Sequence, residues 1–142
     1  MKEKILIVED TPLHMKLMEI TIRAQNYTLL KATDGEEALD IAARERPDLI
    51  LMDIRLPKMS GFEVAKKLRE NPALSHIPII AITAHAMSGD RDKIIASGCA
   101  TYLTKPVDTR QLPGVIAEML LKRKKETPSV NVGSNGKENP DN

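Results

Sequence analysis

Acidic, hydroxyl and amine side chains stand at the ends of four short apolar runs of this sequence. Glu9 and Asp10 follow the first run, Asp53 follows the second, Thr83 closes the third and Lys105 follows the fourth. If the runs are neighbouring parallel strands, these side chains emerge at one edge of one sheet. Three carboxylates, a hydroxyl and an ammonium group that meet there can bind a divalent metal ion and accept a phosphoryl group.

A carboxylate nucleophile needs help to approach a phosphoryl donor, because both are anionic. For one pair of unit charges ~4 Å apart in a medium of dielectric ~20, the repulsion is on the order of 4 kcal/mol. Glu9, Asp10 and Asp53 are hard oxygen ligands of the kind that Mg²⁺ prefers, and Lys105 adds a second positive charge. The Thr83 hydroxyl can donate a hydrogen bond to a phosphoryl oxygen. The pattern predicts a magnesium-assisted phosphoacceptor at Asp53.

Strands and helices are expected to alternate along the chain. Continuous apolar runs are typical of strands that are covered on both faces, as in a parallel sheet. They predict strands over Lys4–Val8, Thr28–Ala32, Leu49–Met52, Ile77–Ile82 and Ala100–Thr104. Helical spacing predicts helices over Pro12–Gln25, Glu36–Arg44, Gly61–Glu70, Ser88–Ala96 and Thr109–Lys122. This alternation indicates an α/β sandwich, in which ligands bind beyond the carboxyl ends of the strands.

Length and composition indicate one globular domain. The chain has 142 residues, which we divide into a domain over 1–125 and a disordered polar tail over 126–142. Lysine and arginine number 21 against 20 acids, so bulk attraction to nucleic acid is not expected. The single cysteine, Cys99, excludes an intrachain disulfide and is expected to be a small buried residue. No apolar stretch is long enough for a membrane span or a signal peptide, so we expect a cytoplasmic protein.

Five motifs in register resemble the receiver domain of two-component response regulators. They are Glu9-Asp10, Asp53 with the following Leu56-Pro57, Ser60-Gly61, Thr83-Ala84 and Lys105-Pro106. The resemblance runs from about Lys4 to Leu121. It implies a doubly wound, flavodoxin-like, three-layer sandwich with five parallel strands in the order 2-1-3-4-5.

The resemblance also implies a role for each motif residue. Asp53 would take a phosphoryl group from a phosphohistidine on a sensor histidine kinase or a histidine phosphotransfer protein. Mg²⁺ would be held by the side chains of Glu9, Asp10 and Asp53 and by the backbone carbonyl of Arg55. Thr83 and Lys105 would bind the phosphoryl oxygens, Tyr102 would change rotamer with Thr83, and the Lys105–Pro106 bond would be cis. A downstream protein would then read the face of the fourth helix, fifth strand and fifth helix.

Several positions allow two interpretations. Tyr102 is either a switch or a tyrosine that simply packs on the sheet. Arg55 and His85 either tune the lifetime of the phosphoryl group or form a passive rim, and His14 is most simply a surface residue. The first helix has more apolar side chains than a single stripe facing the sheet requires, so either some are exposed for docking a kinase or all are buried. Pro113-Gly114 means that the fifth helix either starts near Leu112 or is kinked.

The leading hypothesis is a regulatory module without a DNA-binding output domain, whose self-phosphorylation and autodephosphorylation are too weak to make it an enzyme. Three alternatives remain at this stage. The chain could be a receiver domain excised from a hybrid kinase or a larger regulator. A magnesium-dependent phosphohydrolase would need an acid where Arg55 stands, and a flavin or nucleotide binder would need a glycine-rich loop where Glu9–Pro12 stands.

Overall fold

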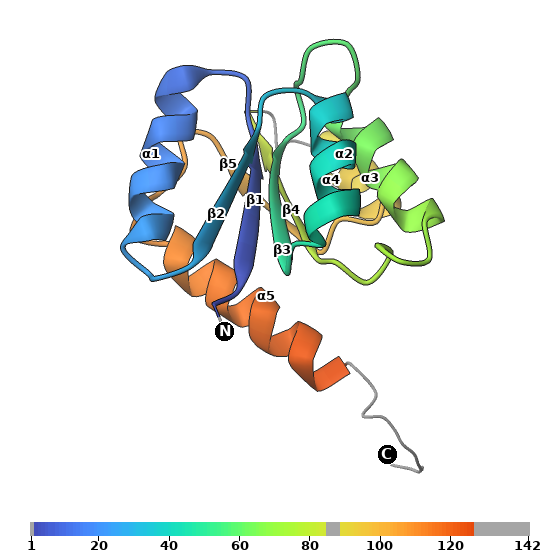
Figure 1. Cartoon of the computed structure of the whole chain (residues 1–142). Helices are drawn as coiled ribbons and strands as arrows, with labels where there is room; N and C mark the ends of the chain where they lie inside the picture. Colours follow the sequence, from blue (N-terminus) through green and yellow to red (C-terminus); the bar gives the residue numbers. More distant parts are fainter. Residues whose placement is uncertain (1, 85–88, 127–142) are drawn as a thin grey trace.

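A computed structural model describes residues 2–84 and 89–126. Within them, five parallel strands form one sheet in the order β2-β1-β3-β4-β5 between two layers of helices, so the predicted fold class is confirmed (Figure 1). The strands are β1 (Lys4–Val8), β2 (Thr28–Ala32), β3 (Leu49–Asp53), β4 (Ile79–Thr83) and β5 (Thr101–Thr104). The helices are α1 (Pro12–Arg23), α2 (Gly35–Glu45), α3 (Gly61–Glu70), α4 (Gly89–Ala96) and α5 (Leu112–Glu126).

The sheet has a hydrophobic core on each face. Helices α1 and α5 cover one face, and α2, α3 and α4 cover the other (Figure 1). Successive strand residues point to opposite faces, so Leu6 packs in the core under α2 and α3 while Ile7 packs in the core under α1 and α5. All residues of β3 and β4 are buried. This burial on both faces explains why the central strands are continuous apolar runs.

Capping residues set the starts of two helices near the functional edge of the sheet. The Asp34 side chain accepts a hydrogen bond from the N–H of Glu37 at 2.8 Å, which caps α2. Ser60 and Glu63 form a reciprocal capping box at the start of α3. Helix α2 therefore begins at a defined residue shortly after the end of β2, and α3 does so after the loop that follows β3.

Several element bounds differ from the predicted ones. Strand β4 begins at Ile79 and not at Ile77, because the N–H of Ile77 donates to the carbonyl of Leu74 in the preceding turn and Pro78 has no N–H. Helix α1 ends at Arg23 and not at Gln25, since the chain enters the left-handed region at Asn26 (φ 65°). The predicted helix start at Ser88 lies outside the described residues.

Helix α5 begins at Leu112, which is the first of the two alternatives left open by Pro113 and Gly114. Pro113 lies in the first turn, where the missing N–H has no intrahelical partner to lose. The predicted start at Thr109 is therefore wrong, and the three preceding residues form a turn in which Asp108 accepts backbone hydrogen bonds. The helix continues to Glu126, and the rest of the predicted tail lies outside the described residues. No helix in the described ranges is both long and apolar enough to cross a membrane.

Candidate phosphoacceptor site

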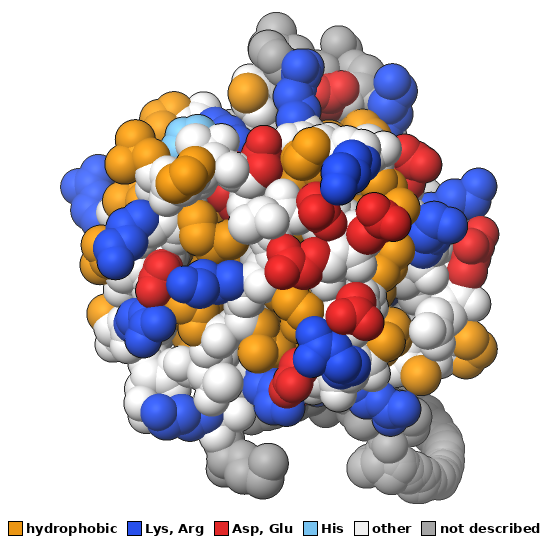
Figure 2. Space-filling model, turned by 45° about the horizontal axis from the view of Figure 1, so that its top comes forward, with side chains coloured by type: hydrophobic (Ala, Val, Ile, Leu, Met, Phe, Trp, Pro, Cys, Tyr) orange, Lys and Arg blue, Asp and Glu red, His pale blue; other side chains and the backbone are white. Residues whose placement is uncertain are grey.

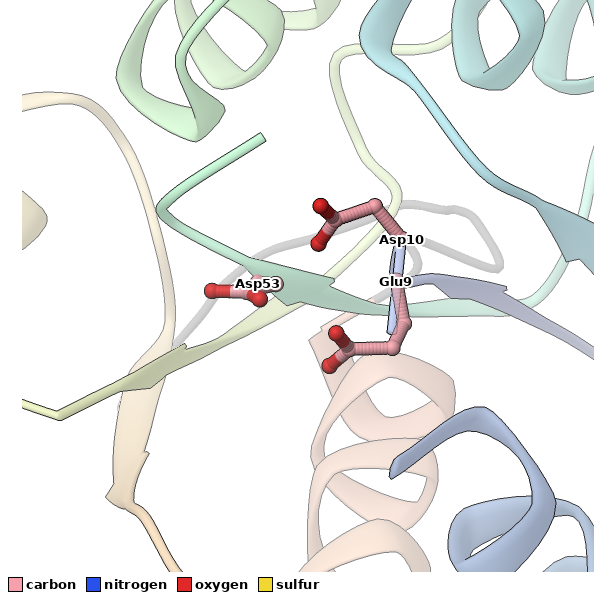
Figure 3. Close-up of side chains that lie close together, drawn as sticks. All are labelled: Glu9, Asp10 and Asp53. Atoms are coloured by element: carbon pink, nitrogen blue, oxygen red, sulfur yellow. The ribbon is translucent and has the colours of Figure 1, made fainter. Parts of the chain in front are cut away.

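Three carboxylates meet at the carboxyl ends of two neighbouring strands. Glu9 and Asp10 follow β1, Asp53 ends β3, and Val8 pairs with Met52 in the sheet register. One oxygen from each carboxylate lies within 4.8 Å of the other two, and the three groups turn to the same side (Figure 3). Glu9 and Asp53 are buried, with 1% and 3% of their surface exposed, while Asp10 is exposed. The structure thus brings together the three predicted metal-ligating side chains.

The backbone around Asp53 is held by close packing with α3. The N–H of Gly61 donates to the carbonyl of Ile54 at 2.8 Å, and the Asp53 Oδ1 atom accepts from the N–H of Arg55 at 3.0 Å. A Cβ atom at Gly61 would lie 2.8 Å from the Asp53 carbonyl oxygen, which is closer than such atoms can approach. Glycine at this position therefore lets the first turn of α3 lie against the end of β3.

Lys105 supplies the positive charge beside Asp53. Its Nζ atom donates to Asp53 Oδ2 at 2.8 Å and lies 3.6 Å from Glu9 Oε1. Burial alone would lower the pKa of Lys105, but the hydrogen bond to Asp53 and the charges of Asp53 and Glu9 outweigh burial and raise it. The Lys105 N–H donates to the carbonyl of Thr83 at 2.8 Å, and the Lys105–Pro106 bond is cis. Backbone contacts between the ends of β4 and β5 thus place this lysine.

Glu9 has one buried carboxylate oxygen without a hydrogen-bond donor among the described residues. Its Oε2 atom accepts from the N–H of Thr11 at 3.1 Å, whereas no described residue donates a hydrogen bond to the buried Oε1 atom. Burial raises the pKa of Glu9, with a further contribution from the charge of Asp53. A buried carboxylate oxygen without a donor, 3.6 Å from an ammonium group and beside two more carboxylates, fits a hard divalent cation such as Mg²⁺.

The other predicted residues lie around this centre. Thr83 ends β4 and is buried, and the register pairs the preceding Ile82 with Asp53, so its side chain belongs to the same edge of the sheet. Tyr102 lies on β5, two residues before its end, and is half-buried against the core under α2, α3 and α4. The Arg55 side chain is exposed. His85 lies outside the described residues.

His14 is a site residue that the sequence interpretation missed. Its side chain is 44% exposed, but Nδ1 lies 3.8 Å from Glu9 Oε2 and 3.5 Å from Lys105 Nζ. The sequence did contain a hint, because His14 lies in the first turn of α1. A helix that starts two residues after Asp10 has one side of its first turn facing Glu9 and Asp10. The structure therefore adds an imidazole to the predicted set of side chains.

Helix α1 also presents an apolar stripe beside the site. Leu13, Leu17 and Ile20 are 74%, 41% and 57% exposed and recur at helical spacing, whereas Met15, Met18 and Ile22 are buried against the sheet. In Figure 2, hydrophobic side chains are exposed on the side of the molecule where α1 lies. Of the two interpretations of this helix, the one with exposed apolar residues is confirmed.

Comparison with known proteins relates the chain to signalling proteins. The family model for the response regulator receiver domain matches residues 5–117. The polar-differentiation response regulator DivK of Brucella anthropi is 50% identical over 107 residues, which cover 75% of this chain and 87% of that protein. DivK of Brucella ovis is 49% identical over the same lengths. The sequence resembles DivK in segments such as Pro47–Ile54, and these relatives confirm that resemblance.

Solved structures show the same fold. The receiver domain of the sensor histidine kinase PA1611 from Pseudomonas aeruginosa, with a magnesium ion coordinated in its active site cleft, is 34% identical with a TM-score of 0.79. That match covers 84% of this chain and 98% of that one. A CheY-like response regulator receiver domain protein from Methanospirillum hungatei is 28% identical with a TM-score of 0.83, over 89% of this chain and 100% of that one.

Proposed function

Because this chain belongs to the response regulator receiver domain family, we propose that Asp53 accepts a phosphoryl group from a phosphohistidine and that the phosphorylated domain switches a partner-binding surface. The donor is a sensor histidine kinase or a histidine phosphotransfer protein. The observation that carries the proposal is the hydrogen bond of 2.8 Å between Lys105 and Asp53, next to two further carboxylates. An aspartate with a purely structural role would not require an ammonium group and two further carboxylates beside it.

In the proposed reaction, an Asp53 carboxylate oxygen attacks the phosphorus atom and the bond from phosphorus to the histidine nitrogen breaks. The electron pair of that bond returns to the imidazole, and an acyl phosphate forms on Asp53. Lys105 lies where it can pair with a phosphoryl oxygen once its hydrogen bond to Asp53 is released, and the Thr83 hydroxyl serves as a second donor.

Magnesium belongs to this proposal as the cofactor. Glu9, Asp10 and Asp53, together with the backbone carbonyl of Arg55, are the residues that would hold it. When bound, the ion supplies positive charge that reduces the repulsion between the Asp53 carboxylate and the incoming phosphoryl group. The oxygen-only donor set and the unsatisfied Glu9 Oε1 atom support the choice of a hard cation.

The surfaces of the molecule support two kinds of protein partner. The stripe formed by Leu13, Leu17 and Ile20 lies next to the site, so a kinase or phosphotransfer protein that packs on it brings its phosphohistidine near Asp53. Movement of Thr83 toward the phosphoryl group, followed by Tyr102, would alter the face of α4, β5 and α5 for a downstream target. We include no nucleic-acid or membrane partner, and place the protein in the cytoplasm.

The proposal describes a switch and not an enzyme that turns over. Receiver domains are generally not enzymes in the ordinary sense. A phosphohydrolase would use an acid two residues after Asp53, where this chain has Arg55. A flavin or nucleotide binder would cradle phosphate between β1 and α1, where Glu9 and Asp10 place two negative charges.

Two candidates exist for the protein in which this receiver works, a stand-alone regulator and a larger multidomain protein. The similarity to DivK supports a receiver domain that acts without an attached output domain and extends to the end of α5 at Glu126, with a polar tail over 127–142. The second candidate is a receiver excised from a hybrid kinase or a larger regulator, because the receiver of PA1611 belongs to a sensor histidine kinase. The phosphoryl chemistry at Asp53 is the same in both.

Intact-mass measurement tests the proposal. The purified chain is incubated with Mg²⁺ and acetyl phosphate, in parallel with the Asp53→Asn variant and with a sample containing a chelator. We expect one added phosphoryl group on the wild type and none in the other two samples. Equal phosphorylation of Asp53→Asn would refute the assignment of Asp53, and steady release of phosphate over many cycles would favour the phosphohydrolase.

A further inference from the structure

We propose that His14 is a positioning residue that holds the Lys105 ammonium group toward Asp53; this inference deepens the proposed function and rests on it. The two side chains are 91 positions apart in the sequence, and the Nδ1 atom of His14 lies 3.5 Å from Lys105 Nζ. His14 does not contact the phosphoryl group in this proposal and acts only through Lys105.

The lysine needs such a restraint because its side chain is long and flexible. An ammonium group carries three N–H donors on a stem with four rotatable bonds, and ordering that stem costs conformational entropy. Asp53 Oδ2 at 2.8 Å takes one donor, and Glu9 Oε1 lies at 3.6 Å. The imidazole of His14 on α1 is the remaining neighbour for which the described residues provide a contact with Nζ.

The imidazole is itself held in place by the start of α1. Pro12 occupies the first turn, and the N–H of Met15 donates to the carbonyl of Thr11 at 3.0 Å. Burial of Met15 and Met18 against the sheet fixes the rotation of the helix. His14 Nδ1 also lies 3.8 Å from Glu9 Oε2, which is beyond hydrogen-bond distance, so Nδ1 is available to accept from the ammonium group.

This placement has a consequence when the phosphoryl group arrives. Asp53 must give up its hydrogen bond with Lys105 as its oxygen attacks, and at that moment the contact with His14 keeps the ammonium group within reach of the new phosphoryl oxygens. Without His14, the Lys105 ammonium group loses its contact with α1. One weak hydrogen bond of this kind corresponds to about a fivefold change in an equilibrium or a rate.

Four proteins test the inference: wild type, His14→Ala, His14→Gln and Lys16→Ala. Glutamine keeps an oxygen acceptor, one bond farther from the backbone than Nδ1, on a flexible side chain that can still reach Lys105. Lys16 is exposed on the same helix and makes no hydrogen bond or ion pair with a site residue in the described ranges, so its variant is the matched control. Thermal unfolding of each variant is recorded first, and His14→Gln retains the comparison if His14→Ala folds poorly.

The first readout needs no phosphorylation. Hydrogen exchange at the ¹⁵Nζ of Lys105, assigned with Lys105→Arg, is measured by NMR in metal-free buffer. We expect exchange about fivefold faster in His14→Ala, near wild type in His14→Gln and unchanged in Lys16→Ala. Equal exchange in His14→Ala and wild type, or equally fast exchange in His14→Gln and His14→Ala, would overturn the positioning role.

The second readout is the rate of phosphorylation by acetyl phosphate with Mg²⁺. We expect a decrease of about fivefold in His14→Ala, recovery in His14→Gln and less than about a twofold change in Lys16→Ala. An unchanged rate in His14→Ala would contradict the inference. If the wild type itself takes up no phosphoryl group, the proposed function fails, and the exchange measurement still decides whether His14 restrains Lys105.

Discussion

Replacing Asp10 with asparagine should make the metal-free protein more stable. The Asp10 carboxylate lies within 4.8 Å of the carboxylates of Glu9 and Asp53, and no residue in the described ranges gives it a hydrogen bond or an ion pair. Even at the dielectric constant of water, each like-charge pair at this separation costs about 0.9 kcal/mol. After the attraction of Lys105 is subtracted, we expect a gain of about 1 kcal/mol, or about 4 °C in the midpoint of thermal unfolding.

With magnesium present, the wild type should become more stable than Asp10→Asn. An ion that binds only the folded state adds about 1.4 kcal/mol when its concentration is ten times its dissociation constant. The wild type should gain this stability and Asp10→Asn should gain much less, because it has lost one oxygen anion from the cluster.

Thermal unfolding followed by circular dichroism, with a chelator and then with Mg²⁺, measures both effects at a pH above the raised pKa of Glu9, where all three carboxylates are charged. Asp40→Asn is the matched control, since it removes an exposed acid whose one ion-pair partner among the described residues is Arg44 on α2, and it should change stability by less than about 0.5 kcal/mol. A lower midpoint for Asp10→Asn in the chelator, or an undiminished response to Mg²⁺, would refute the argument from charge repulsion.

Three further substitutions probe the site and the backbone that supports it. The pKa of Glu9 is raised by burial, so above pH 4.5 the folded chain retains a proton that the unfolded chain has lost, and the wild type loses stability as the pH rises through the raised pKa. In urea unfolding without metal, the free energy of unfolding of Glu9→Gln should therefore increase relative to that of the wild type as the pH rises from about 4 to about 8. A difference between the two free energies that stays constant with pH would contradict this. Gly61→Ala should cost about 1 to 3 kcal/mol, because its Cβ would lie 2.8 Å from the backbone of β3. Gly114→Ala, with open space around the new atom, should gain about 0.5 kcal/mol, and the opposite order of the two midpoints would show that the close approach is not limiting.

The sequence was most informative where one physical rule applies alone. Continuous apolar runs located β1 and β3 to within one residue, because strands buried on both faces leave little room for polar residues. The same runs predicted that Glu9, Asp10 and Asp53 would meet, since parallel strands end at one edge of the sheet.

Predictions were weaker where neighbouring elements compete for the same residues. The start of β4 moved past Ile77, whose N–H is used by the preceding turn, and the start of α5 moved to Leu112, where Pro113 fits the first turn. His14 was taken for a surface residue because sequence spacing does not show which side of a helix's first turn faces a site. The roles of Thr83 and Tyr102 remain predictions, because a switch concerns two states of the molecule.

The most direct test of the central claim is to locate the phosphoryl group in the chain. Reduction of the phosphorylated protein with borohydride converts an acyl phosphate to an alcohol, and peptide mass spectrometry identifies the residue that has changed. The account predicts homoserine at position 53 in the wild type, dependent on Mg²⁺, with Asp10 and Glu9 unmodified. Reduction at another acid, or a stable phosphoryl group on a histidine or serine with position 53 intact, would contradict it.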